Sequence, residues 1–467
     1  MMDDNTAFLV RLIRTTGTAE YKRSMEIAKR AFIDYLASSL AARHCDKVES
    51  LAKYIQSISL ETNIANQSLV ALWPVALLGR MIKARPEEAA LFNGFQSHYL
   101  DYDDAQANIA GHFSTVLFSA LLAMATPKDT LRHILEAYIL GAEVEGLLGE
   151  RLNPAHKKNG WHSTGTVGPV GAAVAIGKLR GLDEGKLVQL ISFSATQSAG
   201  MGFEAGSDGK PLHAGMAARN AVWAYRLVVE TDLEAAENIF NDTTGWLFTF
   251  GKVPFEKSRW QKAWFSPGQL LSPGLWMKLH QYCSAAICGA AACAKIRRDY
   301  LEAGYTWNDI GQVVLDFPNG ADTALRYTNP QSGQEGRFSM EFVAWQELAL
   351  GGVDDALFMA TSVPEEFRKV AMSGLFVRQH TLTAVEKTVR ITRVIVRMKD
   401  GNIFSAVEDS PIGSPQRPLS DDKIKHKLVC AIGEKPADIL YDKVHKDIDR
   451  PCDWTRVINV ILGNIAL

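Results

Sequence analysis

The chain has 467 residues, of which 47% are hydrophobic and 22% charged, with a formal net charge of -2. This composition is typical of a folded globular protein, and the balanced charge excludes a broad electrostatic surface for nucleic acid or anionic lipid. A chain of this length exceeds what one hydrophobic core usually organises, so we expect two domains.

The chain start and the cysteines indicate a cytoplasmic protein. Residues 1–5 are acidic and lack the charged-then-apolar layout of a secretory signal. No uninterrupted apolar run is long enough to span a bilayer. Of the six cysteines, Cys283, Cys288 and Cys293 recur five apart, a spacing that fits no zinc motif. We therefore expect neither a structural metal nor a disulfide framework.

The first half of the chain predicts a bundle of helices. Between Glu20 and Arg43, and again between Leu131 and Leu152, apolar residues recur every three or four positions, as on one buried helix face. Residues 167–179 and 214–229 are rich in alanine and glycine, which lets neighbouring helices approach closely. No dinucleotide or phosphate-binding loop is present. These segments predict a large all-helical domain.

Strand patterns begin beyond the Ser-Pro-Gly repeats at residues 266–274. Val313, Leu315 and Phe317 alternate with polar positions, as in a strand. Two further β-rich runs, 388–398 and 403–407, flank Asp400-Gly401, and an Asp-Gly pair in that place predicts a hairpin. We predict a smaller α+β domain.

The tail returns to a helical pattern, with Ser420 as a predicted helix N-cap. The fold class expected is therefore mainly α. An all-helical domain would take residues 1–268 and 409–467, and an α+β domain would take residues 269–408.

One short stretch concentrates the titratable side chains. It runs from Asn93 to Ser114, lies after a predicted helix, and is expected to be a loop where polar groups converge. Its acidic and imidazole residues are His98, Asp101, Asp103, Asp104 and His112. Three interpretations remain open at this point: the groups exchange protons with a ligand, they bind a metal, or they cap and hydrate a helix end.

Three further clusters lie along the chain. His162 stands in Gly160-Trp-His-Ser-Thr-Gly-Thr, where free backbone N–H groups at a helix start could bind an anion or where the segment simply caps the helix. Lys210 and His213 lie three apart at another predicted helix start, either as a ligand pair or as surface residues. Lys278 stands near the predicted domain junction, a favoured place for ligand pockets.

Together the clusters supply imidazole, ammonium, hydroxyl and carboxylate groups with no paired-histidine metal motif. That set suits a small polycarboxylate that loses or gains a carbon-bound proton. A cation must neutralise the neighbouring carboxylate, and fixed donors must stabilise the enolate-like charge that develops. The sequence therefore indicates proton transfer at carbon.

The same motifs resemble those of the MmgE/PrpD family, which includes 2-methylcitrate dehydratase, cis-aconitate decarboxylase and iminodisuccinate epimerase. They follow the family order over most of the chain. The motifs are Asn93-Gly94, His98-x-x-Asp101-Tyr-Asp-Asp104, Gly111-His112-x-Ser114, Gly160-Trp-His162-x-Thr164-Gly, Gly181-Leu-Asp183, Lys210-Pro-Leu-His213-Ala-Gly-x-Ala-Ala218, Lys278 with Cys283, and Phe338-Ser339.

The resemblance implies a large all-helical domain with an α+β lid, usually in a homodimer, and chemistry without a metal or organic cofactor. It implies a small carboxylate substrate and no nucleic-acid or membrane partner. The catalytic residues implied are Asp101, His112, His162, Lys210 and Lys278. The substrate-binding residues implied are His98, Ser114, Thr164, His213 and Cys283.

Within that set, Lys210, His162 and Lys278 would hold carboxylates, and His112 with Asp101 would transfer the proton. Asp103 and Asp104 are interpreted as structural support.

Three functions stay open. The first is a lyase, either a dehydratase or a decarboxylase, acting on a polycarboxylate. The second is an isomerase of the epimerase type, which removes and returns a proton at one carbon. The third is a non-catalytic relative, suggested by Ala105, Asp208 and Gln281, which stand where the decarboxylase pattern has other residues.

Overall fold

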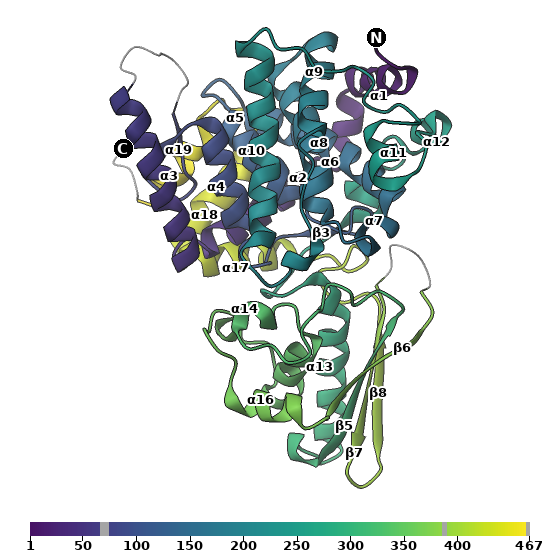
Figure 1. Cartoon of the computed structure of the whole chain (residues 1–467). Helices are drawn as coiled ribbons and strands as arrows, with labels where there is room; N and C mark the ends of the chain where they lie inside the picture. The colour runs from purple at the N-terminus through teal and green to yellow at the C-terminus, as the bar shows by residue number, and fades with distance from the viewer. Residues whose placement is uncertain (66–73, 385–389, 464–467) are drawn as a thin grey trace. The chain divides into compact units, whose positions relative to one another are not determined.

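The computed structural model describes residues 1–65, 74–384 and 390–463, and they are mainly helical with short strands (Figure 1). The predicted mainly α fold class is confirmed. The chain divides into two compact units: unit 1 takes residues 1–201, 210–275 and 420 onward, and unit 2 takes residues 202–209 and 276–419. The domain boundaries predicted from the sequence, at 268/269 and 408/409, stay a prediction of where independently folding domains begin and end.

Unit 1 is a bundle of helices. In the N-terminal part these are α1 (Asp4–Thr15), α2 (Thr18–Ala41), α3 (Asp46–Ala65), α4 (Pro86–His98), α5 (Phe113–Met124), α6 (Leu131–Leu152), α7 (Ala155–Lys158), α8 (Ser163–Arg180), α9 (Glu184–Ala195), α10 (Gly209–Glu230), α11 (Trp246–Gly251) and α12 (Lys257–Ala263). Two-residue strands are β1 (Val75–Ala76), β2 (Lys83–Ala84), β3 (Ala105–Gln106) and β4 (Leu275–Trp276).

The centre of unit 1 is built from helices with small residues at their contacts. Every residue of α5 is buried, and so are Ser163 to Gly177 of α8. A Cβ atom added to Gly141 of α6 would lie 2.9 Å from the backbone oxygen of Gly171 on α8, so the two backbones nearly touch. The prediction that alanine and glycine mark close helix packing is confirmed here.

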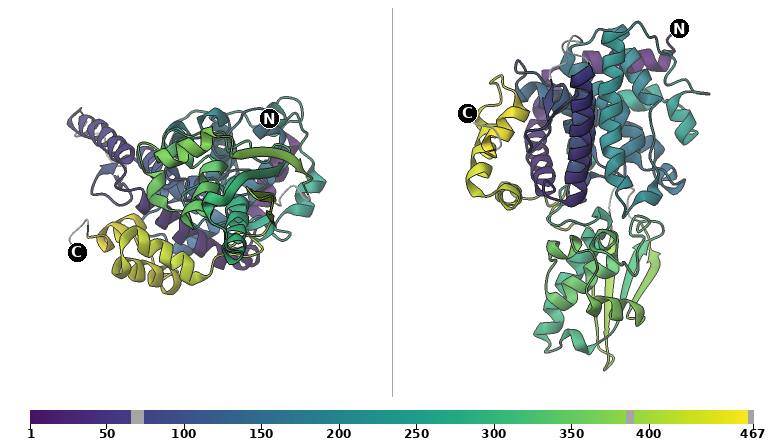
Figure 2. Two further views of the ribbon diagram at one scale, coloured as in Figure 1. Left: turned by 90° about the horizontal axis from the view of Figure 1, so that it is seen from below. Right: turned by 60° about the vertical axis from the view of Figure 1, so that its left-hand side comes forward.

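The C-terminal helices of unit 1 are α17 (Asp421–Ile432), α18 (Glu434–Lys446) and α19 (Trp454–Ile461). They lie beside the N-terminal helices, and α17 packs along α2 (Figure 2). Ser420 caps α17 as predicted, because its side chain accepts a hydrogen bond from the backbone N–H of Lys423. One face of α17 is buried through Ile424, Lys427 and Leu428.

Unit 2 contains a four-stranded sheet in the order β6-β5-β7-β8, formed by β5 (Ile310–Pro318), β6 (Phe376–Leu382), β7 (Thr392–Met398) and β8 (Ile403–Glu408). β6 is parallel to β5, whereas β7 is antiparallel to both of its neighbours. Helix α13 (Ile287–Glu302) packs on β7 and β8. Shorter helices are α14 (Gly333–Gly336), α15 (Met340–Trp345) and α16 (Glu365–Met372).

The hairpin predicted at Asp400-Gly401 is confirmed, since β7 and β8 pair across it and Gly401 has a positive φ of 96°. Thr388 and Val389, the first residues of the predicted strand, lie outside the described residues. In the part of the chain that the structure describes, no helix has both the length and the apolarity needed to cross a membrane.

Candidate active site

The predicted acidic and imidazole stretch forms one buried cluster in unit 1. Helix α4 ends at His98, a loop follows, and His112 is the N-cap of α5. The two imidazole rings meet edge to face with centroids 4.4 Å apart. One side-chain nitrogen or oxygen from each of His98, Asp101, Asp103 and His112 lies within 4.8 Å of the others.

Asp103 bridges the two imidazoles. Its carboxylate oxygens lie 2.9 and 3.0 Å from Nδ1 of His98, and Oδ2 lies 3.1 Å from Nδ1 of His112. Nδ1 of His112 also donates to the backbone oxygen of Asp104 at 2.6 Å. Because a carbonyl oxygen can only accept, Nδ1 of His112 carries its proton and Nε2 is left with the lone pair in the neutral ring.

Lys210 closes the other side of the cluster. Its Nζ lies 2.8 Å from Nε2 of His98 and 2.9 Å from Oδ1 of Asp101. An ammonium group can only donate, so Nε2 of His98 accepts and Nδ1 carries the proton that is given to Asp103. Both histidines therefore share one tautomer, and their Nδ1 atoms converge on Asp103.

A close helix contact sets the position of Lys210. Lys210 lies in the first turn of α10, five residues before Gly215, and His98 ends α4, four residues after Gly94. A Cβ on Gly94 would lie 2.7 Å from the Cα of Gly215, and a Cβ on Gly215 would lie 2.3 Å from the backbone oxygen of Leu91. Only glycine allows this approach, which brings the ammonium to the end of α4.

The loop between α4 and α5 is strained at Asp101. This residue has a φ of 51°, in the left-handed backbone region that residues other than glycine rarely adopt. Nε2 of His112 lies 3.7 Å from Oδ1 of Asp101. A protonated His112 would therefore lie between two carboxylates, those of Asp101 and Asp103.

His162 extends the cluster on another element, as the N-cap of α8. Its ring stacks with that of His98 at 6.0 Å, and its Nδ1 lies 3.1 Å from Nδ1 of the half-buried His213. The backbone N–H of His112 donates to the hydroxyl of Thr164 at 3.2 Å. The start of α8 thus contributes both an imidazole and a contact that fixes His112.

Ser114 and Thr164, both predicted to bind substrate, are fully buried. The Ser114 hydroxyl donates to Oδ2 of Asp104 at 2.5 Å and lies 2.9 Å from the hydroxyl of Tyr138. The structure therefore places the Ser114 hydroxyl between the side chains of Asp104 and Tyr138.

Burial and neighbouring charges set the protonation states. Burial lowers the pKa of His98 to about 3, and Lys210 adds to this fall against the opposing effect of Asp103, so the ring is neutral. Burial opposes ionisation of Asp103, yet hydrogen bonds and charge from His112 and His98 hold its pKa well below its ordinary value. Burial, with the nearby Lys210, likewise lowers the pKa of His162 well below its ordinary value.

Asp104 behaves differently from Asp103. Burial, then repulsion by Asp34, raises the pKa of Asp104 to about 8. Two adjacent carboxyl groups thus differ in charge near neutral pH: Asp103 is an anion that orients histidines, and Asp104 is mostly protonated.

The donor set could also hold a metal ion, one of the interpretations left open by the sequence. However, the Lys210 ammonium lies within hydrogen-bond distance of His98 Nε2 and Asp101 Oδ1, on two of the side chains that would have to bind the ion. A metal bound there would have to displace that ammonium and overcome its repulsion. The geometry therefore favours proton transfer over metal binding.

Lys278 and Cys283 belong to unit 2. Both are buried, and the backbone N–H of Cys283 donates to the backbone oxygen of Arg337 at 2.9 Å. Their predicted place beside the unit 1 cluster stays a prediction. Asp208, also in unit 2, accepts a hydrogen bond from Gln334 at 2.9 Å.

Sequence reasoning assigned Asp103 no contact with the reacting groups. Its position five residues after His98 and nine before His112 was visible, but a loop has no fixed periodicity from which the direction of its side chains follows.

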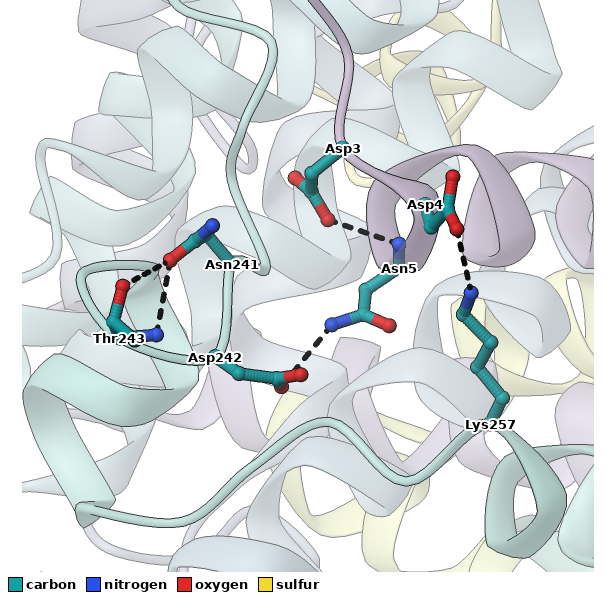
Figure 3. Close-up of a pocket in the computed structure, with 7 residues that line it drawn as sticks. All are labelled: Asp3, Asp4, Asn5, Asn241, Asp242, Thr243 and Lys257. Atoms are coloured by element: carbon teal, nitrogen blue, oxygen red, sulfur yellow. Dashed lines mark hydrogen bonds and ion pairs between the residues drawn. The ribbon is translucent and has the colours of Figure 1, made fainter.

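A polar hollow in unit 1 is lined by none of the predicted site residues (Figure 3). It is lined by Asp3, Asp4, Asn5, Asn241, Asp242, Thr243 and Lys257. Its side chains are paired with one another: Asn5 donates to Asp242 at 3.1 Å, and Lys257 lies 3.6 Å from Asp4. This hollow shows no convergent group aimed at a ligand.

The fold and the site define a class of protein: a mainly helical chain whose core carries a buried histidine, aspartate and lysine cluster suited to proton transfer. Residues 10–257 match the MmgE/PrpD N-terminal domain, which is more than half of the chain. The chain belongs to the MmgE/PrpD family, and the predicted family is confirmed.

Several characterised relatives are similar over most of their length. The chain is 25% identical to cis-aconitate decarboxylase of Homo sapiens over 379 residues, covering 74% of this chain and 73% of the relative. It is 24% identical to the enzyme of Mus musculus, covering 73% and 71%. It is 22% identical to that of Aspergillus terreus, covering 94% and 91%. These similarities support a lyase of the decarboxylase type at family level.

Proposed function

We propose that this protein is a lyase that acts on a small polycarboxylate by proton transfer at a carbon next to a carboxylate. The observation that carries the proposal is the fixed tautomer of His112. Its Nδ1 donates to the backbone oxygen of Asp104 at 2.6 Å, which leaves Nε2 as the proton acceptor on the side of Asp101.

In the proposed reaction, Nε2 of His112 accepts or delivers the proton at carbon. The imidazolium that forms lies between the carboxylates of Asp101 and Asp103, at 3.7 and 3.1 Å. Both carboxylates are in place before the reaction, so the new charge is stabilised without rearrangement of the site. A general acid–base group of this kind contributes typically 10²–10⁴-fold to a rate.

The substrate carboxylates are assigned to the cationic and imidazole side of the cluster. Lys210 supplies the ammonium group, and His162 a neutral imidazole at the start of α8. The resemblance adds Lys278 of unit 2 as a further carboxylate ligand, and this part rests on the motif alone. The relatives named cis-aconitate decarboxylase favour loss of CO2 over loss of water.

An epimerase is the second candidate, because a base that removes and returns one proton needs the same groups. A single experiment separates the candidates: the protein is incubated in D2O with citrate-, aconitate- and aspartate-derived acids and followed by proton NMR. A new vinyl signal from a hydroxy acid means dehydration, and new C–H signals from a product with one carboxylate fewer mean decarboxylation. Deuterium uptake without net change means epimerisation, and silence with every acid contradicts an enzymatic function in this substrate class.

The base is tested by His112→Gln in the same assay, with His426→Gln, on the exposed side of α17, as the matched control. We expect His112→Gln to abolish solvent exchange and turnover, whereas the control retains both. Wild-type exchange in His112→Gln would remove His112 from this role. Retained turnover in a chelator is expected, and chelator-sensitive turnover would instead support metal binding by the cluster.

We also propose a homodimer, which the resemblance implies, and a cytoplasmic location, which stays a prediction from the sequence. Light scattering of the purified protein measures its molar mass in solution. A mass of two chains supports the homodimer, and a mass of one chain contradicts it. Fractionation of cells that express the chain tests its location.

A further inference from the structure

A buried lysine from the C-terminal helices contacts the loop of the candidate site. Lys427 of α17 is 2% exposed, and its Nζ donates to Oδ1 of Asp34 at 2.7 Å. The same Nζ donates to the backbone oxygen of Tyr102 at 2.7 Å and lies 3.7 Å from the centroid of the Tyr102 ring. All of these residues belong to unit 1.

Tyr102, whose carbonyl Lys427 binds, lies in the middle of the loop that carries the site carboxylates. Tyr102 stands between Asp101, whose φ of 51° is strained, and Asp103, which orients both imidazoles. A left-handed backbone at a residue other than glycine persists only where its surroundings impose it. The ammonium bound to the Tyr102 carbonyl is such a constraint, because it fixes the peptide unit between Tyr102 and Asp103, one residue after the strained Asp101.

The ion pair alone does not account for this arrangement. A buried lysine–aspartate pair loses so much hydration that it is often no more stable than apolar residues of similar volume. We therefore look for the specific effect of Lys427 in the conformation of the loop that it binds and not in the stability of the fold. Lys427 also lies beyond residues 10–257, the part of the chain that matches the family's N-terminal domain.

We propose that Lys427 is a positioning residue of the candidate site, which holds the Asp101–Asp103 loop in its strained conformation through the Tyr102 carbonyl. Its effect on turnover rests on the proposed function, but its effect on the loop does not. The C-terminal helix α17 thereby becomes part of the machinery that orients His98 and His112.

The double variant removes the donor and the carboxylate together, so that neither charge of the ion pair is left alone in the core. In Asp34→Asn/Lys427→Met the pair becomes neutral and of similar volume, and Asp34→Asn alone keeps the donor to Tyr102. Two measurements are compared with wild type. The first is the far-downfield NMR signals of the Nδ1 protons that His98 and His112 donate. The second is kcat and KM on the acid that the D2O experiment identifies as the substrate. Circular dichroism confirms that each variant is folded at the temperature used.

We expect the double variant to lose or shift both Nδ1 proton signals, and its kcat to fall by about 100-fold with KM nearly unchanged, as for a small misplacement of catalytic groups. Asp34→Asn should retain both signals. Persistence of both signals in the folded double variant overturns the inference, whatever its rate. If wild type turns over no acid, the proposed function fails, and the proton signals alone decide the role of Lys427.

Discussion

The Asp103 carboxylate lies 3.1 Å from Nδ1 of His112, and the same group lies 2.9 Å from Nδ1 of His98. One buried anion therefore faces the Nδ1 atoms of two neighbouring imidazoles, whose tautomers the Asp104 carbonyl and the Lys210 ammonium set. The arrangement resembles, in its logic, the aspartate that orients a catalytic histidine in hydrolases, where the carboxylate sets the ring and stabilises its protonated form.

Asp103→Asn should lower kcat by roughly 10²–10⁴-fold, because a neutral amide does not stabilise the imidazolium of His112 and can turn a donor toward its Nδ1. KM should change little, since Asp103 is fully buried and is not assigned to the substrate. Steady-state kinetics on the substrate identified by NMR tests this.

The matched control is Asp104→Asn, the adjacent residue, whose contact with His112 runs through its backbone oxygen. We expect this control to retain most of the activity. Equal losses in both variants would mean that the loop as a whole, and not the Asp103 anion, determines the rate.

The same Asp104→Asn variant should change how stability depends on pH. The pKa of Asp104 is about 8 in the folded state, against an ordinary value of 3.8 for an exposed aspartate, so folding takes up a proton between these limits. The contribution of Asp104 therefore favours folding at low pH and declines as pH rises from about 4 to 8. Asn carries no charge and removes that decline.

Urea unfolding at pH 5 and at pH 8.5 measures this effect. The free energy of unfolding of Asp104→Asn, relative to wild type, should be larger at pH 8.5 than at pH 5. Comparison of the two proteins at each pH cancels the opposite trend from His98, whose lowered pKa costs stability as pH falls below about 6.5. A difference that does not vary with pH would contradict a raised pKa at Asp104.

Lys210→Met should raise the pKa of His98 from about 3, because the ammonium is one cause of its depression. The value should stay below 6.5, since burial remains the larger cause. A pH titration of ring signals by NMR measures the shift without any substrate. The exposed Lys262→Met on α12 is the control, and an unchanged His98 pKa in Lys210→Met would argue against the contact between Lys210 and His98.

Much of the fold follows from sequence periodicity. The predicted helix from Leu131 to Leu152 has the observed bounds of α6, and the Asp400-Gly401 hairpin pairs as expected. Long amphipathic runs and Asp-Gly turns encode their own geometry. Helix α5 is different: all of its residues are buried, so no apolar stripe indicates which way Ser114 points.

The residues of the candidate site could be predicted only in part from their positions in the sequence. His98, Asp101 and His112 are close in sequence, whereas Lys210 joins them through a contact between distant helices, which only the family resemblance anticipated. Lys427 was missed because a lysine in a polar helix is normally exposed. Its burial depends on how α17 packs along α2, which spacing alone does not encode.

The helix contact itself gives the last prediction. Gly215→Ala would place a Cβ 2.3 Å from the backbone oxygen of Leu91 and 3.1 Å from the backbone nitrogen of Phe95, so α10 must move away from α4. We expect the free energy of unfolding in urea to be about 1–3 kcal/mol lower than in wild type, as for overpacked cores. Because Lys210 lies one turn away on α10, kcat should fall as well.

Gly185→Ala on α9 is the matched control, since its added Cβ would meet nothing closer than 3.6 Å and alanine is the better helix former. This variant should keep wild-type activity and be at least as stable. If Gly215→Ala is as stable as the control, the helices can separate without cost. If it is destabilised but fully active, the spacing of α4 and α10 supports the fold without determining where the Lys210 ammonium lies.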